Sequence, residues 1–457
     1  MKQKRKSKTA VGIWGFGIVG KSALHYFKSK NCTVEIFDAQ PISKKNKTLI
    51  ADSNASITHD LDLFLQKNDQ ILASPGIDVY PYKKYKHKWI TELDLIQLNF
   101  HKPIIAITGT VGKTTVTHML SQLLKNSGLK VFTGGNIGTG MLELLNEKHK
   151  DNDCAILEAS SFQLEQCKEF APDVAIWTNF SSNHLDRHKT AEQYFQAKKK
   201  IFQRQKKEHH AILPLEVAHQ ISTFGEIKST LLFFSKMLKQ SYSLFPLFTI
   251  KGGSVMRHNN KKKPLVCNKN IQEVFKSVTN ASFEENGLIV AAAAQILEQL
   301  FGKTFLFTQP VTPLPPHRLE YVAAMNGVTF YNDSKSTTPT ATVAAVQKCS
   351  VKPILLLLGG LSKGADRAPM LKQIKSQVKK IYAFGAERTK IQECCEQLNI
   401  VCSSLTTLKK AFEQTLAEAR PNDLVLLSPA GASFDLFNNY KERGDFFKKL
   451  VAECERK

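Results

Sequence analysis

The chain has 457 residues, of which 42% are hydrophobic, and its 63 Lys and Arg residues outnumber 40 Asp and Glu residues to give a formal net charge of +23. This length is too great for one hydrophobic core and predicts about three domains. No apolar run approaches the roughly 18 residues that span a bilayer, and the basic N-terminus lacks the apolar stretch and cleavage site of a signal peptide. We therefore expect a cytoplasmic globular protein without membrane insertion.

The positive charge has two interpretations. Basic patches attract nucleic acid, but the lysines are spread along the chain, and the runs at 198–200 and 261–263 lack interleaved aromatic residues. We favour a generally lysine-rich composition, whose field would also collect anionic nucleotides, and expect no nucleic-acid partner. The nine cysteines are scattered without paired zinc-binding spacing, so we expect reduced, mostly buried thiols.

The first predicted unit opens with a strand, a tight turn and a helix within residues 10–24. A second strand at 33–37 ends in Asp38, and residues 71–77 predict another strand that runs into a loop at the same sheet edge. The turn has the G-x-G-x-x-G pattern, with glycines Gly15, Gly17 and Gly20. In dinucleotide-binding folds these glycines admit a pyrophosphate and the acid binds a ribose. The pattern indicates a bound diphosphate without saying which one.

The most informative segment is 104–115, where a β-branched strand leads into a glycine-containing loop and a helix that begins near Thr114. Such a loop directs backbone N–H groups into one concavity at the positive end of the helix. Lys113 would add a charge for the outer phosphates, and the Thr114 hydroxyl a ligand for Mg²⁺. Because Ile107 stands where the first glycine of the full phosphate-loop motif falls, an ordinary turn with an exposed lysine is the alternative.

Further strands are predicted at 154–157 and 174–178, each running into polar residues. Residues 203–280 are less patterned, and within them the Gly252-Gly253-Ser254 segment and the lysine run at 261 suggest surface excursions. The stiff proline linker at 312–316 marks a boundary. Beyond it, strands at 328–332, 353–358, 380–384 and 423–427 alternate with helices, and the loops 359–364 and 428–433 lie at strand ends. We predict an α/β protein of three domains, each a mostly parallel doubly wound sheet. Their boundaries are 1–101, 102–312 and 313–457.

The presence of two phosphate-binding loops in separate domains argues against a dehydrogenase and against a simple NTPase. A dehydrogenase needs no Gly-Lys-Thr-Thr, and a simple NTPase needs no preceding diphosphate domain. A ligase that brings a nucleotide-linked substrate to ATP needs both. The chain resembles the Mur ligases of peptidoglycan synthesis in several motifs that follow one another in the right order over nearly its whole length. These motifs are 109–115, 158–164, 183–188, 316–318 and 332–337. Residues 428–435 and 443–444 are most similar to the D-glutamate-adding members.

The resemblance implies an ATP-dependent acid–amino-acid ligase with UDP-N-acetylmuramoyl-L-alanine and D-glutamate as substrates. In this family ATP phosphorylates the substrate carboxylate, the amine attacks the acyl phosphate, and phosphate leaves. Because a carboxylate is a poor electrophile, phosphoryl transfer supplies it with a leaving group, and this transfer depends on positioning and charge neutralisation. We expect a cytoplasmic monomer that serves cell-wall synthesis, cell shape and cell division.

Residue roles are also carried over by resemblance. The catalytic residues would be Lys113, Glu158, His184 and Lys198. Two Mg²⁺ ions would be held by Thr114, Glu158, His184 and a carbamylated Lys198. ATP would contact Gly109, Thr110, Gly112, Lys113, Thr114, Thr115, Asn286, Arg318, Asp333 and Lys335. The UDP-sugar would contact Gly15, Gly17, Gly20, Asp38, Ser74, Gly76, Asn136 and Ser160. D-Glutamate would contact Thr337, Lys363, Ser433 and Tyr440.

Some positions depart from the family pattern. Val111 replaces an Asn or Lys and offers the phosphates only its backbone N–H, and Ser182 and Asn183 stand where acids are common. Glu285 replaces a usual His, and Tyr440 a usual Phe. Three alternatives stay open: another Mur or folylpolyglutamate-type ligase, a nucleic-acid-associated P-loop NTPase, and an inactive scaffold. Asp38, Lys363 and Ser433 also have purely structural interpretations as a turn residue, a loop surface and a helix cap.

Overall fold

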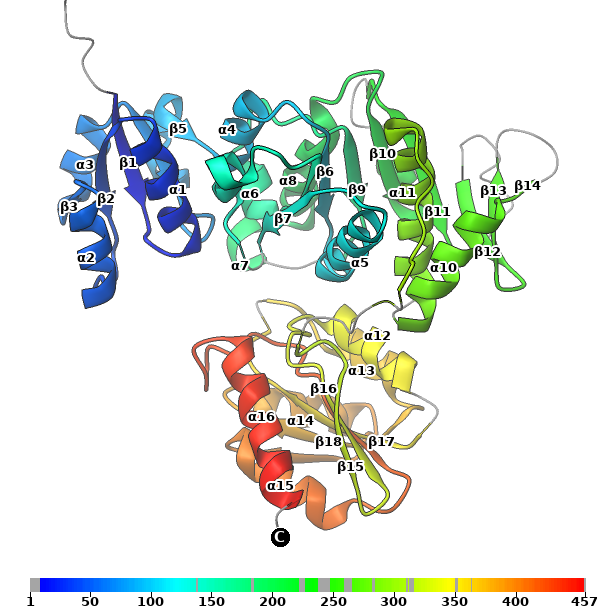
Figure 1. Cartoon of the computed structure of the whole chain (residues 1–457). Coiled ribbons are helices and arrows are strands. Elements are labelled where there is room, and N and C mark those ends of the chain that lie inside the picture. The colour runs from blue at the N-terminus through cyan, green and yellow to red at the C-terminus, as the bar shows by residue number, and fades with distance from the viewer. Residues whose placement is uncertain are drawn as a thin grey trace, which may run out of the picture. The chain divides into compact units, whose positions relative to one another are not determined.

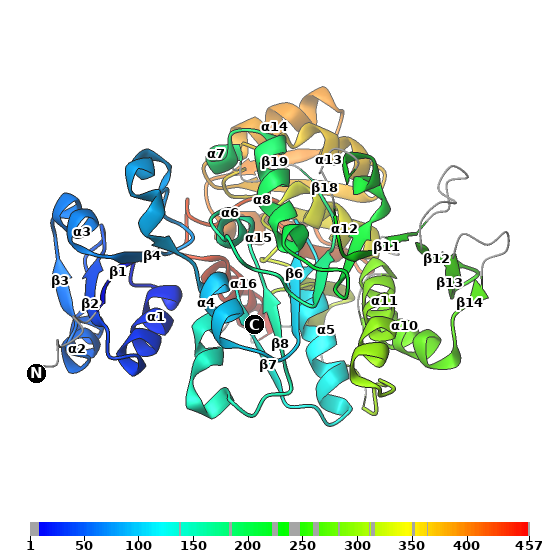
Figure 2. The ribbon, with the colours of Figure 1, turned by 90° about the horizontal axis from the view of Figure 1, so that it is seen from above.

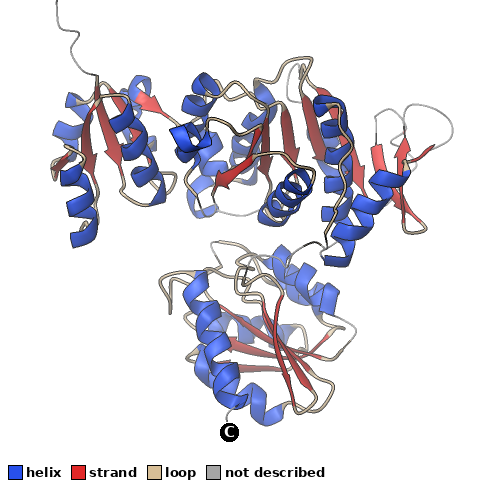
Figure 3. Cartoon of the chain, viewed as in Figure 1, coloured by secondary structure: helices blue, strands red, loops and turns tan. Residues whose placement is uncertain are grey.

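The fold is α/β, with three mostly parallel sheets, as predicted (Figure 1, Figure 3). The computed structural model describes residues 9–136, 139–181, 185–221, 227–236, 247–258, 265–281, 284–309, 311, 316–349, 352–362 and 364–455. The chain forms two compact units, one of Met1–Phe180 with Phe195–Val311 and the other of Ser181–Tyr194 with Thr312–Lys457. None of the helices in these described stretches is both long and apolar enough to cross a membrane.

The N-terminal sheet is parallel throughout, in the order β3-β2-β1-β4-β5. Its strands are β1 (Ala10–Trp14), β2 (Thr33–Phe37), β3 (Ser56–Thr58), β4 (Gln70–Ala73) and β5 (Trp89–Ile90). Its helical segments are α1 (Ile18–Ser29), α2 (Lys44–Asp52), α3 (Leu61–Lys67), η1 (Tyr80–Lys88) and α4 (Glu92–Asn99). Side chains alternate between the two faces, so Val11 and Ile13 pack with α1, whereas Trp14 packs with Phe64 of α3.

The central sheet has the order β14-β13-β12-β11-β10-β9-β6-β8-β7, with antiparallel pairing only from β12 to β14 among its described strands. The strands are β6 (Ile104–Thr108), β7 (Val131–Gly135), β8 (Cys154–Glu158), β9 (Val174–Trp177), β10 (His210–Pro214), β11 (Thr230–Ser235), β12 (Leu247–Lys251), β13 (Ser254–His258) and β14 (Leu265–Val266). Strand β6 lies between β8 and β9, and it consists of Ile, Ala and Thr that are fully or nearly fully buried. Burial on both faces is typical of a central parallel strand.

Helices cover both faces of this sheet. Figures 1 and 2 show α8 on one side and α5 and α11 on the other. The helical segments are α5 (Lys113–Asn126), η2 (Met141–Leu145), η3 (Glu147–His149), α6 (Ser161–Glu165), α8 (Ala191–Gln203), η4 (Leu215–Val217), α9 (Ala218–Ile221), α10 (Lys269–Ala281) and α11 (Glu284–Phe301). Helix α8 packs through Phe195 and Phe202 on Trp177, with ring centroids 5.0 and 6.1 Å apart.

The C-terminal sheet has the order β15-β16-β20-β17-β18-β19, and only β15 pairs antiparallel among the strands described. Its strands are β15 (Glu320–Met325), β16 (Val328–Asn332), β17 (Ile354–Gly359), β18 (Val378–Phe384), β19 (Cys402–Leu405) and β20 (Leu424–Leu427). The helices of this unit are α7 (Leu185–His188), α12 (Pro339–Cys349), α13 (Ala368–Ile374), α14 (Arg388–Gln397), α15 (Leu408–Glu418) and α16 (Tyr440–Glu455). One core lies against α12–α14 and a second against α15 and α16.

The structure assigns the part of the central sheet that the sequence left without elements. The less patterned segment 203–280 contributes β10 to β14 and extends the sheet beyond β9. Strands β10 and β11 are mostly buried, and Gly252 and Gly253, both with positive φ, form the turn between β12 and β13. The two glycines, expected in a surface excursion, lie exposed at the tip of this hairpin, whereas the lysine run at 261–263 lies outside the described residues.

Candidate active site

A tight loop joins β6 to α5 over residues 109–112. Gly109 has φ of +145° and Gly112 of +84°, and a Cβ added at Gly109 would lie 2.0 Å from Thr178 Oγ1. Glycine is therefore required at Gly109 by both backbone and space. Helix α5 begins at Lys113, and its N-cap, Gly112, makes no side-chain cap hydrogen bond. The first turn of α5 therefore follows the glycine loop directly, and such a helix N-terminus is an arrangement suited to a phosphate.

Two lysines meet at this loop. Lys113 Nζ donates hydrogen bonds to the carbonyl oxygens of Gly109 (2.8 Å) and Thr110 (3.1 Å). Lys198 Nζ, brought by α8, donates to the same Gly109 oxygen at 2.8 Å and lies 3.4 Å from Thr108 Oγ1. Lys198 is only 1% exposed. Burial lowers its pKa well below the ordinary value, and the nearby Lys113 charge lowers it further, with Glu158 acting in the opposite direction.

Glu158 ends β8 beside this loop and is 1% exposed. Its Oε1 accepts a long hydrogen bond of 3.5 Å from Asn136 Nδ2. Its Oε2 is buried without a hydrogen-bond partner in the part of the chain that the structure describes. A buried carboxylate oxygen left unpaired is costly unless a cation or donor binds it. The unpaired Glu158 oxygen fits Mg²⁺, which prefers oxygen ligands, and the Thr114 hydroxyl at the start of α5 is an oxygen of the same kind.

Ser160 and Asn136 lie next to Glu158. The backbone N–H of Asn136 donates to Glu158 O at 2.9 Å, which fixes the end of β7 against β8. Ser160 is the N-cap of α6: its Oγ accepts from Gln163 N at 3.2 Å, and Gln163 Oε1 accepts from Ser160 N and Oγ at 3.0 Å each. This capping box fixes the Ser160 side chain by local hydrogen bonds.

Asn179 is a loop-supporting residue that sequence reasoning missed. Its Oδ1 accepts from Val111 N at 2.9 Å and its Nδ2 donates to Val111 O at 3.0 Å, while Thr178 Oγ1 donates to that same oxygen at 2.5 Å. The Val111 N–H, predicted to be available to phosphate, is thus directed to Asn179. An Asn directly after a buried strand was the available signal. Asn286 also lies here, since a Cβ on Gly112 would be 2.9 Å from Asn286 Oδ1.

Local contacts also fix the conformation of the glycine turn that follows β1 in the N-terminal sheet. Gly15 has φ of +88°, and Ser74 Oγ donates to Gly15 O at 3.0 Å. A Cβ at Gly20 would lie 2.2 Å from Gly15 O, so α1 approaches the turn closely, whereas a Cβ at Gly17 would meet nothing. Both carboxylate oxygens of Asp38 accept backbone N–H groups, from Phe16 at 2.7 Å and from Gln40 at 2.9 Å. Asp38 therefore shapes this turn whatever else it binds.

The C-terminal unit gathers its predicted residues at the carboxyl ends of β16 and β20. Asp333 is buried and accepts from Leu319 N (3.1 Å) and Ser428 Oγ (2.8 Å). Burial raises the pKa of Asp333 to about 6, while its hydrogen bonds and the charge of Arg318 lower it. Lys335 Nζ lies 5.1 Å from the centroid of the Tyr440 ring.

Of the remaining predicted residues, Thr337 and Ser433 lie in the part of the chain that the structure describes, and Lys363 and His184 do not. Thr337 is partly buried and follows Lys335, and Ser433 is 2% exposed in the loop after β20. Lys363 lies outside the described residues, as does His184 of the central site. The structure thus brings Lys113, Lys198, Glu158 and Asn136 together in one unit, and Asp333, Lys335 and Tyr440 in the other.

Family comparisons agree with this architecture. The family descriptions "Mur ligase middle domain", "Mur ligase, glutamate ligase domain" and "Mur ligase MurD-like, N-terminal domain" match residues 107–294, 317–431 and 9–96. The chain belongs to the Mur ligase family, whose members are ATP-dependent amide ligases.

Two named relatives are similar to this chain over nearly its whole length. A UDP-N-acetylmuramoylalanine--D-glutamate ligase from Thermoanaerobacter sp. (strain X514) is 33% identical over 456 residues, covering 97% of this chain and 98% of the relative. A protein of the same name from Koribacter versatilis (strain Ellin345) is 30% identical over 457 residues, with the same coverage.

Solved structures share the fold. MurF ligase from Thermotoga maritima in complex with ADP aligns with a TM-score of 0.55 at 18% identity, covering 93% of this chain and 97% of that one. A pseudomurein peptide ligase type C from Methanothermus fervidus aligns with a TM-score of 0.57 at 17% identity, covering 97% and 100%. At these identities the likeness concerns the fold alone.

Proposed function

We propose that this protein is the ATP-dependent ligase that adds D-glutamate to UDP-N-acetylmuramoyl-L-alanine in peptidoglycan precursor synthesis. The observation that carries the proposal is the similarity to D-glutamate ligases at 30–33% identity over 97% of the chain. The loop geometry around Gly109 supports it, because the amino groups of two lysines and a helix N-terminus meet where ATP phosphates would have to be held. Its place of action would be the cytoplasm, as a monomer, in support of cell division.

The proposed division of labour follows the three sheets. Residues 1–101 would bind the UDP-sugar, with the turn at Gly15–Gly20, Ser74 and Gly76 around the diphosphate. Residues 102–312 would bind ATP, and residues 313–457 the amino acid and part of the nucleotide. D-Glutamate would be held by Lys363, Thr337, Ser433 and Tyr440, since a cation and hydroxyl groups suit a dicarboxylate.

In the proposed reaction Lys113 and the N–H groups of α5 hold the phosphates of ATP and neutralise charge as the γ-phosphoryl group moves to the muramoyl-alanine carboxylate. Mg²⁺ bound at Thr114 and Glu158 would supply further charge neutralisation for that transfer. Asn136, fixed beside Glu158, would orient the muramoyl part. The D-glutamate amine then attacks the acyl carbon, the amide C–N bond forms, and phosphate leaves.

Lys198 has a second proposed role. Its depressed pKa favours the neutral amine, and only a neutral amine adds to CO₂ to form a carbamate with release of a proton. The carbamate would convert this buried amine into an anionic oxygen ligand beside Glu158. His184 would complete the set of ligands for a second cation.

The test is phosphate release from ATP by the purified protein with Mg²⁺. Release is expected only when UDP-N-acetylmuramoyl-L-alanine and D-glutamate are both present. A panel of L-lysine, diaminopimelate, L-alanine and L-glutamate serves as the control. Release with another amino acid, and none with D-glutamate, would keep the ligase and reject this substrate.

A further inference from the structure

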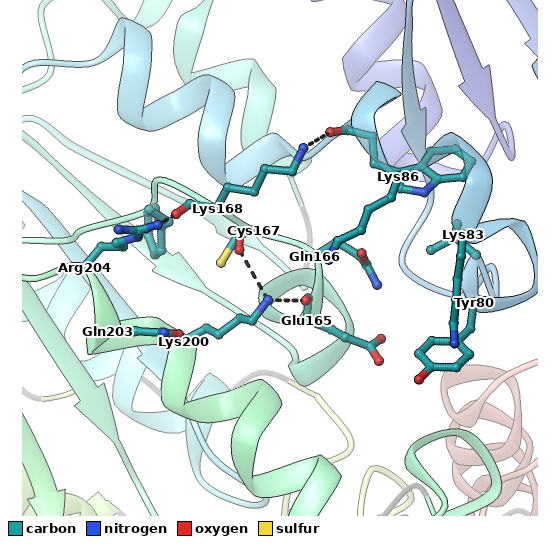
Figure 4. Close-up of a pocket in the computed structure, with 13 residues that line it drawn as sticks. Tyr80, Lys83, Lys86, Glu165, Gln166, Cys167, Lys168, Lys200, Gln203 and Arg204 are labelled. Carbon is teal, nitrogen blue, oxygen red and sulfur yellow. Dashed lines mark hydrogen bonds between the residues drawn. The ribbon is translucent and has the colours of Figure 1, made fainter. Parts of the chain in front are cut away.

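A cavity of about 630 Å³ lies in the N-terminal compact unit, outside the residues assigned above to ATP or the UDP-sugar. One wall comes from η1 and the start of β5, and the other from the segment after α6 together with the end of α8 (Figure 4). This volume is in the range of small-molecule sites. None of the glycines, Ser74, Asn136 or Ser160 lines it.

The lining is strongly basic. It includes one carboxylate, that of Glu165, and five cations: Lys83, Lys86, Lys168, Lys200 and Arg204. Figure 4 shows Lys168, Lys200 and Arg204 on one side of the cavity and Tyr80 and Lys83 on the other. Cations that converge on one concave space repel each other unless an anion lies between them.

Three of these cations are fixed by main-chain oxygens. Lys168 Nζ donates to Trp89 O at 3.0 Å, and Lys200 Nζ donates to Glu165 O at 2.5 Å. Arg204 Nε donates to Lys168 O at 3.0 Å, which leaves its terminal amino groups without a hydrogen-bond partner among the described residues. In that same part of the chain these three side chains form no ion pair, so carboxylates do not neutralise them. A guanidinium whose terminal amino groups can still donate suits a phosphate oxygen.

The rest of the lining suits a less polar group. Val79, Trp89 and Phe170 are buried side chains at the cavity wall, and Tyr80 is 63% exposed. Lys83 Nζ lies 3.9 Å from the centroid of the Tyr80 ring, so the ring and a cation form one surface. Such a surface accepts a flat ring whose phosphate points to the basic wall.

The cavity is distinct from the catalytic loop. Lys198 and Lys200 are two positions apart on α8, which rotates their side chains by about 200° relative to each other. Lys198 accordingly bonds to Gly109, whereas Lys200 bonds to Glu165, the last residue of α6. We propose that this cavity binds a phosphorylated small molecule, with its phosphate on Lys200 and Arg204 and its ring against Tyr80 and Trp89.

The probe is 1-naphthyl phosphate, titrated by calorimetry into the full-length protein, with inorganic phosphate as the arm without a ring. Saturable binding is expected in the unmodified protein, and with the same Kd in Lys113→Ala, which removes the phosphate-loop lysine. Arg204→Gln and Lys200→Met should each raise Kd at least tenfold, and Lys200→Arg should restore most of the affinity. Inorganic phosphate should bind more weakly than the naphthyl ester.

Lys207→Gln is the matched control, because it removes the same charge from an exposed position that does not line the cavity. Its Kd should change less than twofold. Three outcomes would overturn the proposal: no saturable binding, binding lost in Lys113→Ala, or equal weakening in Arg204→Gln and Lys207→Gln. The last result would assign the binding to the overall charge. Thermal melts identify any variant that fails to fold. If Lys200→Met fails to fold, the affinity of Lys200→Arg decides whether the Lys200 charge binds the phosphate.

Discussion

Lys113 and Lys198 both donate a hydrogen bond to the carbonyl oxygen of Gly109, each at 2.8 Å. They come from different helices, α5 and α8, and the second is almost completely buried. Two cations on one oxygen are stable only if one of them loses its proton or an anion is bound nearby. Burial first, and then the charge of Lys113, lowers the pKa of Lys198.

The first prediction concerns Lys198. We expect Lys198→Ala to lower kcat for phosphate release by about 100-fold or more, a loss typical of removing one electrostatic group from a transition state. Short carboxylates such as acetate or formate should restore part of the rate, because they supply the anionic oxygen that the proposed carbamate provides. Lys206→Ala, at an exposed position past the end of α8, is the control. Unchanged activity in Lys198→Ala would refute the proposed role.

The second prediction concerns Asn179. Asn179→Ala removes the partner of the Val111 N–H and one of the two side-chain partners of the Val111 oxygen, so the loop is held less firmly and keeps Thr178 Oγ1 at that oxygen. Loss of partly buried hydrogen bonds costs about 1–3 kcal/mol. We expect KM for ATP to rise about tenfold, with a smaller change in KM for D-glutamate. Steady-state kinetics at saturating second substrates separates the two, and equal changes in both KM values would contradict a local effect.

Some elements and site residues could be predicted from the sequence, and others could not. The bounds of β2 and β16 and the positions of Gly15 and Gly109 followed from local patterns, because β-branched runs and glycine spacing reflect local geometry. The strands β10 to β14 did not, because their place in the sheet depends on pairing across long sequence separations. Asn179 was missed for the same reason: its partner is Val111, 68 residues earlier. The buried state of Lys198 was likewise hidden within a run of lysines.

The third prediction uses the buried carboxyl of Glu92, whose Oε2 accepts from Gln163 Nε2 at 3.3 Å. Burial raises its pKa from 4.5 to about 7. Between pH 4.5 and 7, Glu92 therefore keeps its proton in the folded state and has lost it in the unfolded state. The free energy of unfolding falls as the pH rises through this range. The side chain in Glu92→Gln stays neutral. As the pH rises from 4.5 to 8, we expect its free energy of unfolding to fall by roughly 3 kcal/mol less than that of the parent protein.

Urea unfolding at several pH values measures this difference. Glu147→Gln is the matched control, since the Glu147 side chain is 91% exposed and its substitution should leave the pH profile unchanged. Parallel profiles for Glu92→Gln and the parent protein would show that Glu92 is ionised in the folded state.

The last prediction separates two roles of Asp333, whose carboxylate accepts from Leu319 N and Ser428 Oγ. If these internal bonds are its main role, Asp333→Ala leaves the partly buried Leu319 N–H without its carboxylate partner, while Ser428 Oγ keeps Thr342 Oγ1 at 3.0 Å, so the cost is about 1–3 kcal/mol. We expect a clear fall in the thermal midpoint of the C-terminal unit. If Asp333 also contacts the ribose, KM for ATP should rise further than in Ser428→Ala, which removes only one of the internal bonds. Equal KM values in the two variants, each measured well below its melting temperature, would assign Asp333 to the fold of the C-terminal sheet and remove it from the nucleotide site.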